Sequence, residues 1–285
     1  MLRYKEKYMK KNIYSILTIS LTLSAFAQEA ADKKVQAGLV VGSGLAIQKM
    51  GTKRISADGI GNDLTIGANL VFNINETIGF NTGAEFDFET LKYKSSDYES
   101  KNSYYYYNDT EIKPLKDVNI IGGDKLFQMD ERMQKAVYLT IPTMMVFRTK
   151  FFGYMRYFGK FGLRNSFLLS SKTNDTGFNF PVNQLFNETA VAFTNENMKA
   201  KGDIFFFKSA VGLTAGAEWN FSGSTCLLAE IGYYYGFTPL HTNKNIDKGN
   251  NYLFATDAAT GDASISKFNN KATQSQVMLK ISILF

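Results

Sequence analysis

Cysteine and histidine are almost absent from this chain of 285 residues, which contains one of each, Cys226 and His241. One cysteine cannot close a disulfide within the chain, so no disulfide framework is expected. One histidine and one cysteine also fall short of the donors of a typical zinc centre, and the sequence predicts neither a metal nor a cofactor. Cys226 lies in an apolar segment and is interpreted as a small packing residue.

Proline is scarce as well, with 4 residues, whereas the chain has 24 Phe, 16 Tyr and 23 Gly. Aromatic β-formers with scattered glycine favour an all-β protein over a helical one. The formal net charge is +6, but residues 1–11 hold five basic residues against one acidic residue, which leaves +2 for the remainder. A mature chain with so little excess charge has no nucleic-acid footprint.

The first 27 residues have the three parts of a secretory signal peptide. A basic stretch ends at Lys10-Lys11, an apolar run follows over residues 13–23, and Ala25-Phe26-Ala27 supplies a small-residue cleavage site. The apolar run is too short and too rich in Ser and Thr for a helical membrane anchor. No Cys follows the cleavage site, so a lipoprotein is not indicated.

The last ten residues show strict period-two alternation. One face holds apolar side chains and the other holds polar ones; the apolar set is Val277, Leu279, Ile281, Ile283 and Phe285, and the polar set is Gln276, Lys280 and Ser282. A tilted strand of about ten residues crosses the hydrocarbon core of a bilayer. The segment therefore predicts a transmembrane strand that faces lipid on one side.

Seven further segments alternate in the same way, and with the last they cover residues 35–48, 63–74, 77–93, 134–149, 154–171, 203–221, 225–238 and 276–285. Long connections of about 12 to 40 residues alternate with connections of about two to five, as in outer-membrane barrels with long outer loops and short periplasmic turns. The sequence predicts one all-β domain over residues 28–285, an eight-stranded antiparallel up-and-down transmembrane β-barrel. An open edge is not tolerated in lipid, so the last strand must pair with the first.

Charged residues within these strands fall on the polar face, which would line the lumen. They are Glu85, Asp87, Arg156, Lys160, Arg164, Lys208, Glu218, Glu230 and Lys280. The near balance of sign favours a structural luminal charge network that fills a narrow barrel. An acid–base pair or an ion path is the functional alternative. Lys280 is expected to point toward a Glu or Asp.

The segment Tyr138–Phe147, with the sequence YLTIPTMMVF, resembles the "YLEIPLLLKY" strand of the PorT-like outer-membrane barrels of Bacteroidota, with Thr140 in place of the usual Glu. The glycines of the first strand (Gly38, Gly42 and Gly44), the Gly-Tyr seventh strand and the terminal Phe285 extend the likeness. The resemblance implies an integral outer-membrane barrel, and some members of the family take part in type IX protein secretion. Phe285 resembles the C-terminal signal that the barrel-assembly machinery recognises.

Two loop features are candidates for function. His241 is expected at the outer mouth, and an exposed loop histidine is favoured over a general base of a hydrolase. Tyr104–Tyr107 is interpreted as an aromatic edge of a surface loop or a strand extension rather than a stacking site for glycans or a partner.

The predicted function is non-enzymatic: a structural or interaction barrel, embedded in outer-membrane lipid, whose loops at residues 94–133, 172–201 and 239–270 meet a protein partner. Three alternatives remain open. They are a small hydrolase or lipid-modifying enzyme that uses His241, a narrow passive channel, and a soluble lipocalin-like barrel. The last requires an apolar lumen and places Arg156, Lys160 and Arg164 in water.

Overall fold

The structure is a computed structural model that describes residues 33–96, 102–180, 190–222, 225–241, 250–256, 266–268 and 271–285. The signal peptide predicted for residues 1–27 lies outside the described residues and stays a prediction. Within the described ranges no helix combines the length and the apolar character needed to cross a membrane.

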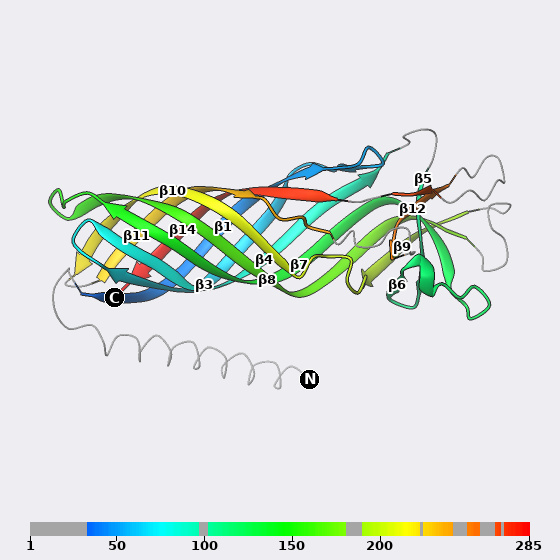
Figure 1. Ribbon diagram of the computed structural model, residues 1–285, viewed down its shortest axis with the longest axis horizontal. Helices are drawn as coiled ribbons and strands as arrows, with labels where there is room; N and C mark the ends of the chain where they lie inside the picture. The colour runs from blue at the N-terminus through cyan, green and yellow to red at the C-terminus, as the bar shows by residue number, and fades with distance from the viewer. Residues whose placement is uncertain are drawn as a thin grey trace, which may run out of the picture.

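Eight long antiparallel strands form a closed ring (Figure 1). In ring order they are β1 (Val35–Met50), β3 (Gly61–Asn73), β4 (Ile78–Ser95), β7 (Lys125–Arg148), β8 (Met155–Phe180), β10 (Phe207–Ser222), β11 (Thr225–Gly236) and β14 (Ala272–Leu284). The last strand pairs back onto the first, with Leu39 opposite Ile283. The predicted eight-stranded up-and-down barrel and its closing pair are therefore confirmed.

The strands are strongly tilted, as the register around the ring shows. Leu139 of β7 lies opposite Phe167 of β8. The same row of pairs, followed the other way around the ring through β4, β3, β1, β14, β11 and β10, reaches β8 at Tyr157. The difference of ten residues between positions 167 and 157 is the stagger that closure of a small barrel requires.

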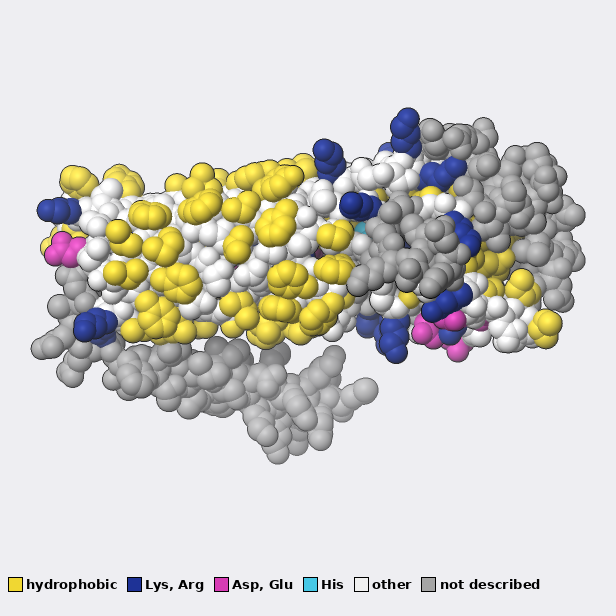
Figure 2. Space-filling model, viewed as in Figure 1, with side chains coloured by type: hydrophobic (Ala, Val, Ile, Leu, Met, Phe, Trp, Pro, Cys, Tyr) yellow, Lys and Arg dark blue, Asp and Glu magenta, His cyan; other side chains and the backbone are white. Residues whose placement is uncertain are grey.

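The two faces of the ring have opposite character. On β14, the Leu279 side chain is 58% exposed and Lys280 is 3% exposed. Apolar side chains cover the outside of the ring as a broad band (Figure 2), and charged side chains point inward. Arg156, Lys160 and Arg164 are all buried inside the ring, so the lipocalin-like alternative is wrong.

Short elements surround the outer parts of β4, β7 and β8. They are β2 (Ile55–Ala57), β5 (Asn102–Asn108), β6 (Glu111–Lys113), the 3-10 helix η2 (Leu115–Asp117), β9 (Val191–Met198), β12 (Phe254–Thr256) and β13 (Ser266–Lys267). The order β13-β12-β5-β7-β8-β9 makes a second sheet, here named the cap sheet, at the right-hand end of Figure 1. The prediction of plain loops over residues 94–133, 172–201 and 239–270 is thus wrong wherever these strands lie.

Aromatic side chains hold the cap sheet together. Tyr105 and Tyr107 pack on one face of β5 against Phe127 and Met129, and this cluster reaches Ala46, Leu91 and Ala272 at the outer end of the ring. Tyr104 and Tyr106 pack on the other face against Phe254, with ring centroids 6.0 and 5.5 Å away. Of the two predicted alternatives, the strand is confirmed and the surface loop is wrong, because the four tyrosines lie in β5 between β12 and β7.

Candidate functional site

The lumen is the part of the molecule where polar chemistry gathers, because the inward face of each strand carries its charged side chains. Near the end with the short turns, Arg156 Nη2 lies 2.6 Å from Glu218 Oε1. Arg148 Nε lies 3.4 Å from the other oxygen of the same carboxylate. One step further along the axis, Lys160 Nζ lies 2.5 Å from Glu230 Oε2. These pairs link β7, β8, β10 and β11.

Arg164 occupies the middle of the lumen. Its Nη2 donates to Asp87 Oδ1 at 2.6 Å and to Glu85 Oε2 at 3.1 Å. Lys280 Nζ reaches the same Glu85 carboxylate at 2.7 and 2.8 Å. The Thr65 hydroxyl donates to Asp87 at 2.6 Å and the Thr140 hydroxyl donates to its other oxygen, so side chains from three strands hold that carboxylate. Charge-assisted bonds of this kind fix both partners strongly.

A third layer lies toward the cap sheet. Gln276 Nε2 donates to Asp63 Oδ2 and to Glu89 Oε1, both at 2.8 Å, and Lys208 pairs with Glu89. The Lys208 ammonium also lies 4.0 Å from the centre of the Tyr138 ring. The structure thus places all nine predicted luminal charges inside the ring, in three paired groups that follow one another along the barrel axis.

Three luminal charges stand beyond the nine of the predicted network: Asp63, Glu89 and Arg148. Glu89 follows Glu85 and Asp87 at the same spacing of two, so the strand alternation places it on the inward face as well. Asp63 and Arg148 stand near strand ends, where alternation alone does not separate lumen from loop. With them, the described part of the lumen holds six cations and six anions.

His241 lies beneath the cap sheet. Its side chain is 4% exposed, its Nδ1 is 3.5 Å from Asp203 Oδ2, and its ring meets the Tyr93 ring edge-on at 5.9 Å. The prediction of an exposed loop histidine is wrong, because the chain after β11 folds under the cap sheet. The surrounding pocket of about 240 Å³ is lined by Met50, Ile55, Tyr93, Met129, Arg132, His241 and Leu253. These lining residues include no Ser, Thr or Cys that could serve as a nucleophile.

A buried ion pair stands above the ring in a region that the sequence predicted as loop. Arg132 binds Asp175 through two parallel bonds of 2.8 Å that join β7 to β8. Burial works against the charged guanidinium, yet Asp175 raises the pKa of Arg132 above its ordinary value. The guanidinium also lies 5.4 Å from the centre of the Tyr105 ring. Arg132 therefore connects the ring to the core of the cap sheet.

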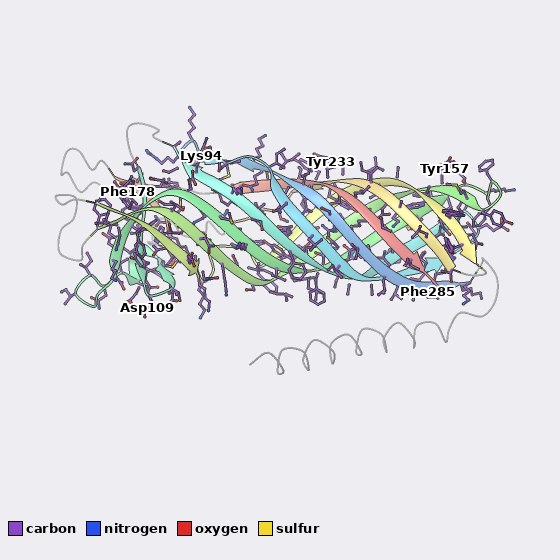
Figure 3. All side chains as sticks on the ribbon, turned by 180° about the vertical axis from the view of Figure 1, so that it is seen from behind. Lys94, Asp109, Tyr157, Phe178, Tyr233 and Phe285 are labelled. Carbon is purple, nitrogen blue, oxygen red and sulfur yellow. The ribbon has the colours of Figure 1, made fainter. Side chains whose placement is uncertain are left out.

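Phe285 ends the closing strand. Its backbone N–H donates to Ala37 O at 2.8 Å. Figure 3 shows Phe285 and Tyr157 at one end of the barrel, and Lys94, Asp109 and Phe178 at the other. The role of Phe285 as an assembly signal stays a prediction.

Across the described ranges, no three His, Cys, Asp or Glu side chains gather as a metal site would need.

A closed eight-stranded ring with an apolar outer band and a charged lumen defines a transmembrane β-barrel. The family model of the outer membrane protein beta-barrel domain matches residues 26–242, and the chain belongs to that family. The protein is accordingly an integral protein of the outer membrane.

Several solved structures resemble the chain at low identity. Ail, the attachment invasion locus protein of Yersinia pestis, matches with 9% sequence identity and a TM-score of 0.34. The match covers 89% of this chain and 100% of that chain. Neisserial surface protein A matches with 7% identity, 89% and 98% coverage and a TM-score of 0.31. The outer membrane protease OmpT of Escherichia coli matches with 8% identity, 90% and 97% coverage and a TM-score of 0.33. Likenesses this distant carry no argument about function, and comparison with curated proteins gave no match.

Proposed function

We propose that this protein is a non-conducting, non-enzymatic barrel of the outer membrane whose cap sheet engages a partner outside the membrane. The observation that carries the proposal is the closely packed centre of the lumen. Arg164 and its partners from β3, β4 and β14 meet at the centre, and the side chains of Arg164, Asp87 and Glu85 are each at most 2% exposed. An eight-stranded barrel has only enough interior space for side chains.

Conductance in planar bilayers tests the closed lumen. The purified full-length protein is expected to give no steady current, because ions would have to displace paired charges from a narrow interior. A Glu85→Ser, Lys280→Ser double variant, which removes one bridging pair, serves as a control and is expected to give brief openings. Steady currents from the unaltered protein would refute the proposal.

The cap sheet supports the interaction role because it stands clear of the lipid band and has an edge strand. On β9, Val191 is 61% exposed and Phe193 is 48% exposed. A photo-crosslinking residue at Phe193 is expected to capture a partner in intact cells. The same residue at Tyr157, which is 57% exposed at the opposite end, is the control. Equal capture at both positions would contradict a partner site on the cap sheet.

A role in protein secretion is the narrower form of this proposal, and it rests on the resemblance of Tyr138–Phe147 to the PorT-like strand. Deletion of the protein is then expected to reduce the secreted proteins of its cell while other outer-membrane barrels keep their amounts. Unchanged secretion removes this form and leaves the broader proposal standing.

The enzyme alternative requires His241 to reach a substrate. Packing against Tyr93 and the apolar lining of its pocket support a structural role instead. His241→Ala is expected to leave any hydrolysis of peptide or lipid ester substrates by the purified protein unchanged. A loss of hydrolysis in this variant, with the fold intact by circular dichroism, would favour the enzyme.

A further inference from the structure

Two lysines face each other at the outer end of the lipid-facing band. Lys135 of β7 and Lys172 of β8 are directly opposite in the register, and both side chains are exposed. Directly opposite side chains on antiparallel strands have Cβ atoms about 4.5–5.5 Å apart, and like charges there destabilise the sheet. A negative charge beside the pair would offset this repulsion.

The positions paired with Lys135 and the next row outward of the two lysines supply no anion. Thr90 lies opposite Lys135 on β4, and Met133 and Asn174 form the next row outward. In the part of the chain that the structure describes, neither lysine forms an ion pair. The same holds for Lys92, which stands opposite Met133 and brings a third ammonium to the group. Lys92, Lys135 and Lys172 together are named the lysine patch.

Two carboxylates lie nearby, on the side away from the membrane. Asp58 and Glu131 line an open pocket of about 460 Å³ with Lys92 and Asn174. Glu131 lies opposite Lys94, two positions outward of the Lys92–Met133 pair, and so stands apart from Lys135 and Lys172. The Asp58 backbone N–H donates to Lys92 O at 2.9 Å, but its carboxylate makes no ion pair with Lys92 among the described residues. The Lys135–Lys172 pair keeps its uncompensated charge.

The lysine patch lies at the outer end of the lipid-facing surface, where lipid headgroups are a source of negative charge. Val137 and Leu169 lie just below the two lysines on the lipid-facing side, and Leu169 is 55% exposed. Figure 2 shows Lys and Arg side chains gathered where the apolar band ends beside the cap sheet. Lysine ammonium groups at this depth meet lipid headgroups, while the residues below meet acyl chains.

We infer that the lysine patch binds the phosphate groups of outer-leaflet lipids. The ammonium groups of Lys135 and Lys172 bracket one phosphate, and Lys92 with the Asn174 amide extends the site outward. A lipid is chosen over free phosphate because the patch is continuous with the lipid-facing surface. The site is independent of the closed lumen and of any partner on the cap sheet.

Native mass spectrometry of the full-length protein released from mixed vesicles tests the site. The vesicles contain equal parts of phosphatidic acid, whose headgroup is a bare phosphate, and phosphatidylcholine. Each lysine near an anionic surface contributes about a five-fold gain in binding. Lys172→Gln is therefore expected to lower the retained phosphatidic acid about five-fold. Lys125→Gln, an exposed lysine of the same strand β7 but within the cap sheet, is the matched control and is expected to change nothing.

Two further measurements test the repulsion between the lysines and distinguish a lipid from free phosphate as the ligand. In pure phosphatidylcholine, Lys172→Gln is expected to unfold at a higher urea concentration than the unaltered protein, because the repulsion is removed. Inorganic phosphate at millimolar concentration is expected to leave the retained lipid unchanged. Equal loss of lipid in Lys172→Gln and Lys125→Gln would overturn the site, and displacement of the lipid by inorganic phosphate would overturn the lipid as its ligand.

Discussion

Lys280 Nζ and Glu85 Oε2 lie 2.7 Å apart across the lumen, although 195 residues separate them in the chain. Two strands, β3 and β1, stand between their own strands in the ring. Lys280 can lean across β1 because its register partner there is Gly42. A Cβ at position 42 would come within 2.7 Å of Lys280 Cγ. The glycine-rich first strand therefore makes room for the central charge network.

The first prediction concerns this pair. Lys280→Ala leaves Glu85 with Arg164 alone, and breaking a buried ion pair costs about 3–5 kcal/mol, so a loss near the lower end of that range is expected. Adding Glu85→Gln removes the carboxylate that has lost one of its two cationic partners, and is expected to restore part of the lost stability. Urea unfolding of the vesicle-inserted protein measures both free energies. If the double variant is less stable than Lys280→Ala, Lys280 is not the main partner of Glu85.

Gly42→Ala supplies a second prediction. The new methyl group must displace the Lys280 side chain, and overpacking of this kind costs about 1–3 kcal/mol. In the Lys280→Ala background the same substitution is expected to cost much less, because the Cγ that it meets is gone. Gly159→Ala, whose Cβ would meet only Thr214 O at 3.5 Å, is the control. Additive losses for Gly42→Ala and Lys280→Ala in urea unfolding would contradict this packing.

The ring strands could be predicted because one rule holds along each of them. Lipid requires apolar side chains at every second position, so Leu279, Ile281 and Ile283 define both a strand and its faces. The pattern also assigns Lys280 and Glu85 to the lumen. The pattern does not predict that Lys280 and Glu85 contact each other, because the partner of each charge depends on the stagger of strands that are distant in the sequence.

The cap sheet escaped prediction for a physical reason. In β7 a register shift between Met129 and Glu131 changes which positions are buried, so Met129 and Arg132 both point to the core although they are three residues apart. A single alternation cannot describe such a strand. In β5 both faces are buried against aromatic side chains, and four successive tyrosines carry no alternation at all. The prediction of a loop position for His241 fails for the same reason, because His241 lies beneath this sheet.

A third prediction follows from the tyrosines of the cap sheet. Burial raises the pKa of Tyr105 and of Tyr107, because the phenolate is disfavoured away from water. The neutral phenols therefore stabilise the fold fully below the unfolded pKa of about 10, and this contribution is lost as the pH rises through the higher folded pKa. Above pH of about 10 the cap sheet is expected to open before the ring does.

Absorbance at 295 nm follows the phenolates, and hydrogen exchange reports β5 and β14 separately. Tyr105→Phe removes one titrating group together with its bond from Asn195 Nδ2 at 3.0 Å, and is expected to move the alkaline opening to higher pH. Tyr154→Phe, at a position 76% exposed, is the control. Opening of β14 together with β5 would contradict a separate cap sheet.

The fourth prediction separates assembly from stability at the end of the chain. Phe285 contributes a backbone hydrogen bond to Ala37 that does not depend on its phenyl side chain, so Phe285→Ser is expected to change the free energy of unfolding by less than about 0.5 kcal/mol. If the assembly machinery recognises the phenyl side chain, the amount of folded Phe285→Ser protein in cellular outer membranes falls several-fold. Leu284 is fully buried beside Cys226 and Leu228, and Leu284→Ala is expected to cost about 2–5 kcal/mol in vitro. Outer-membrane yield from cells and urea unfolding of refolded protein give the two measurements, and equal yields for Phe285→Ser and the unaltered chain would remove the assembly role.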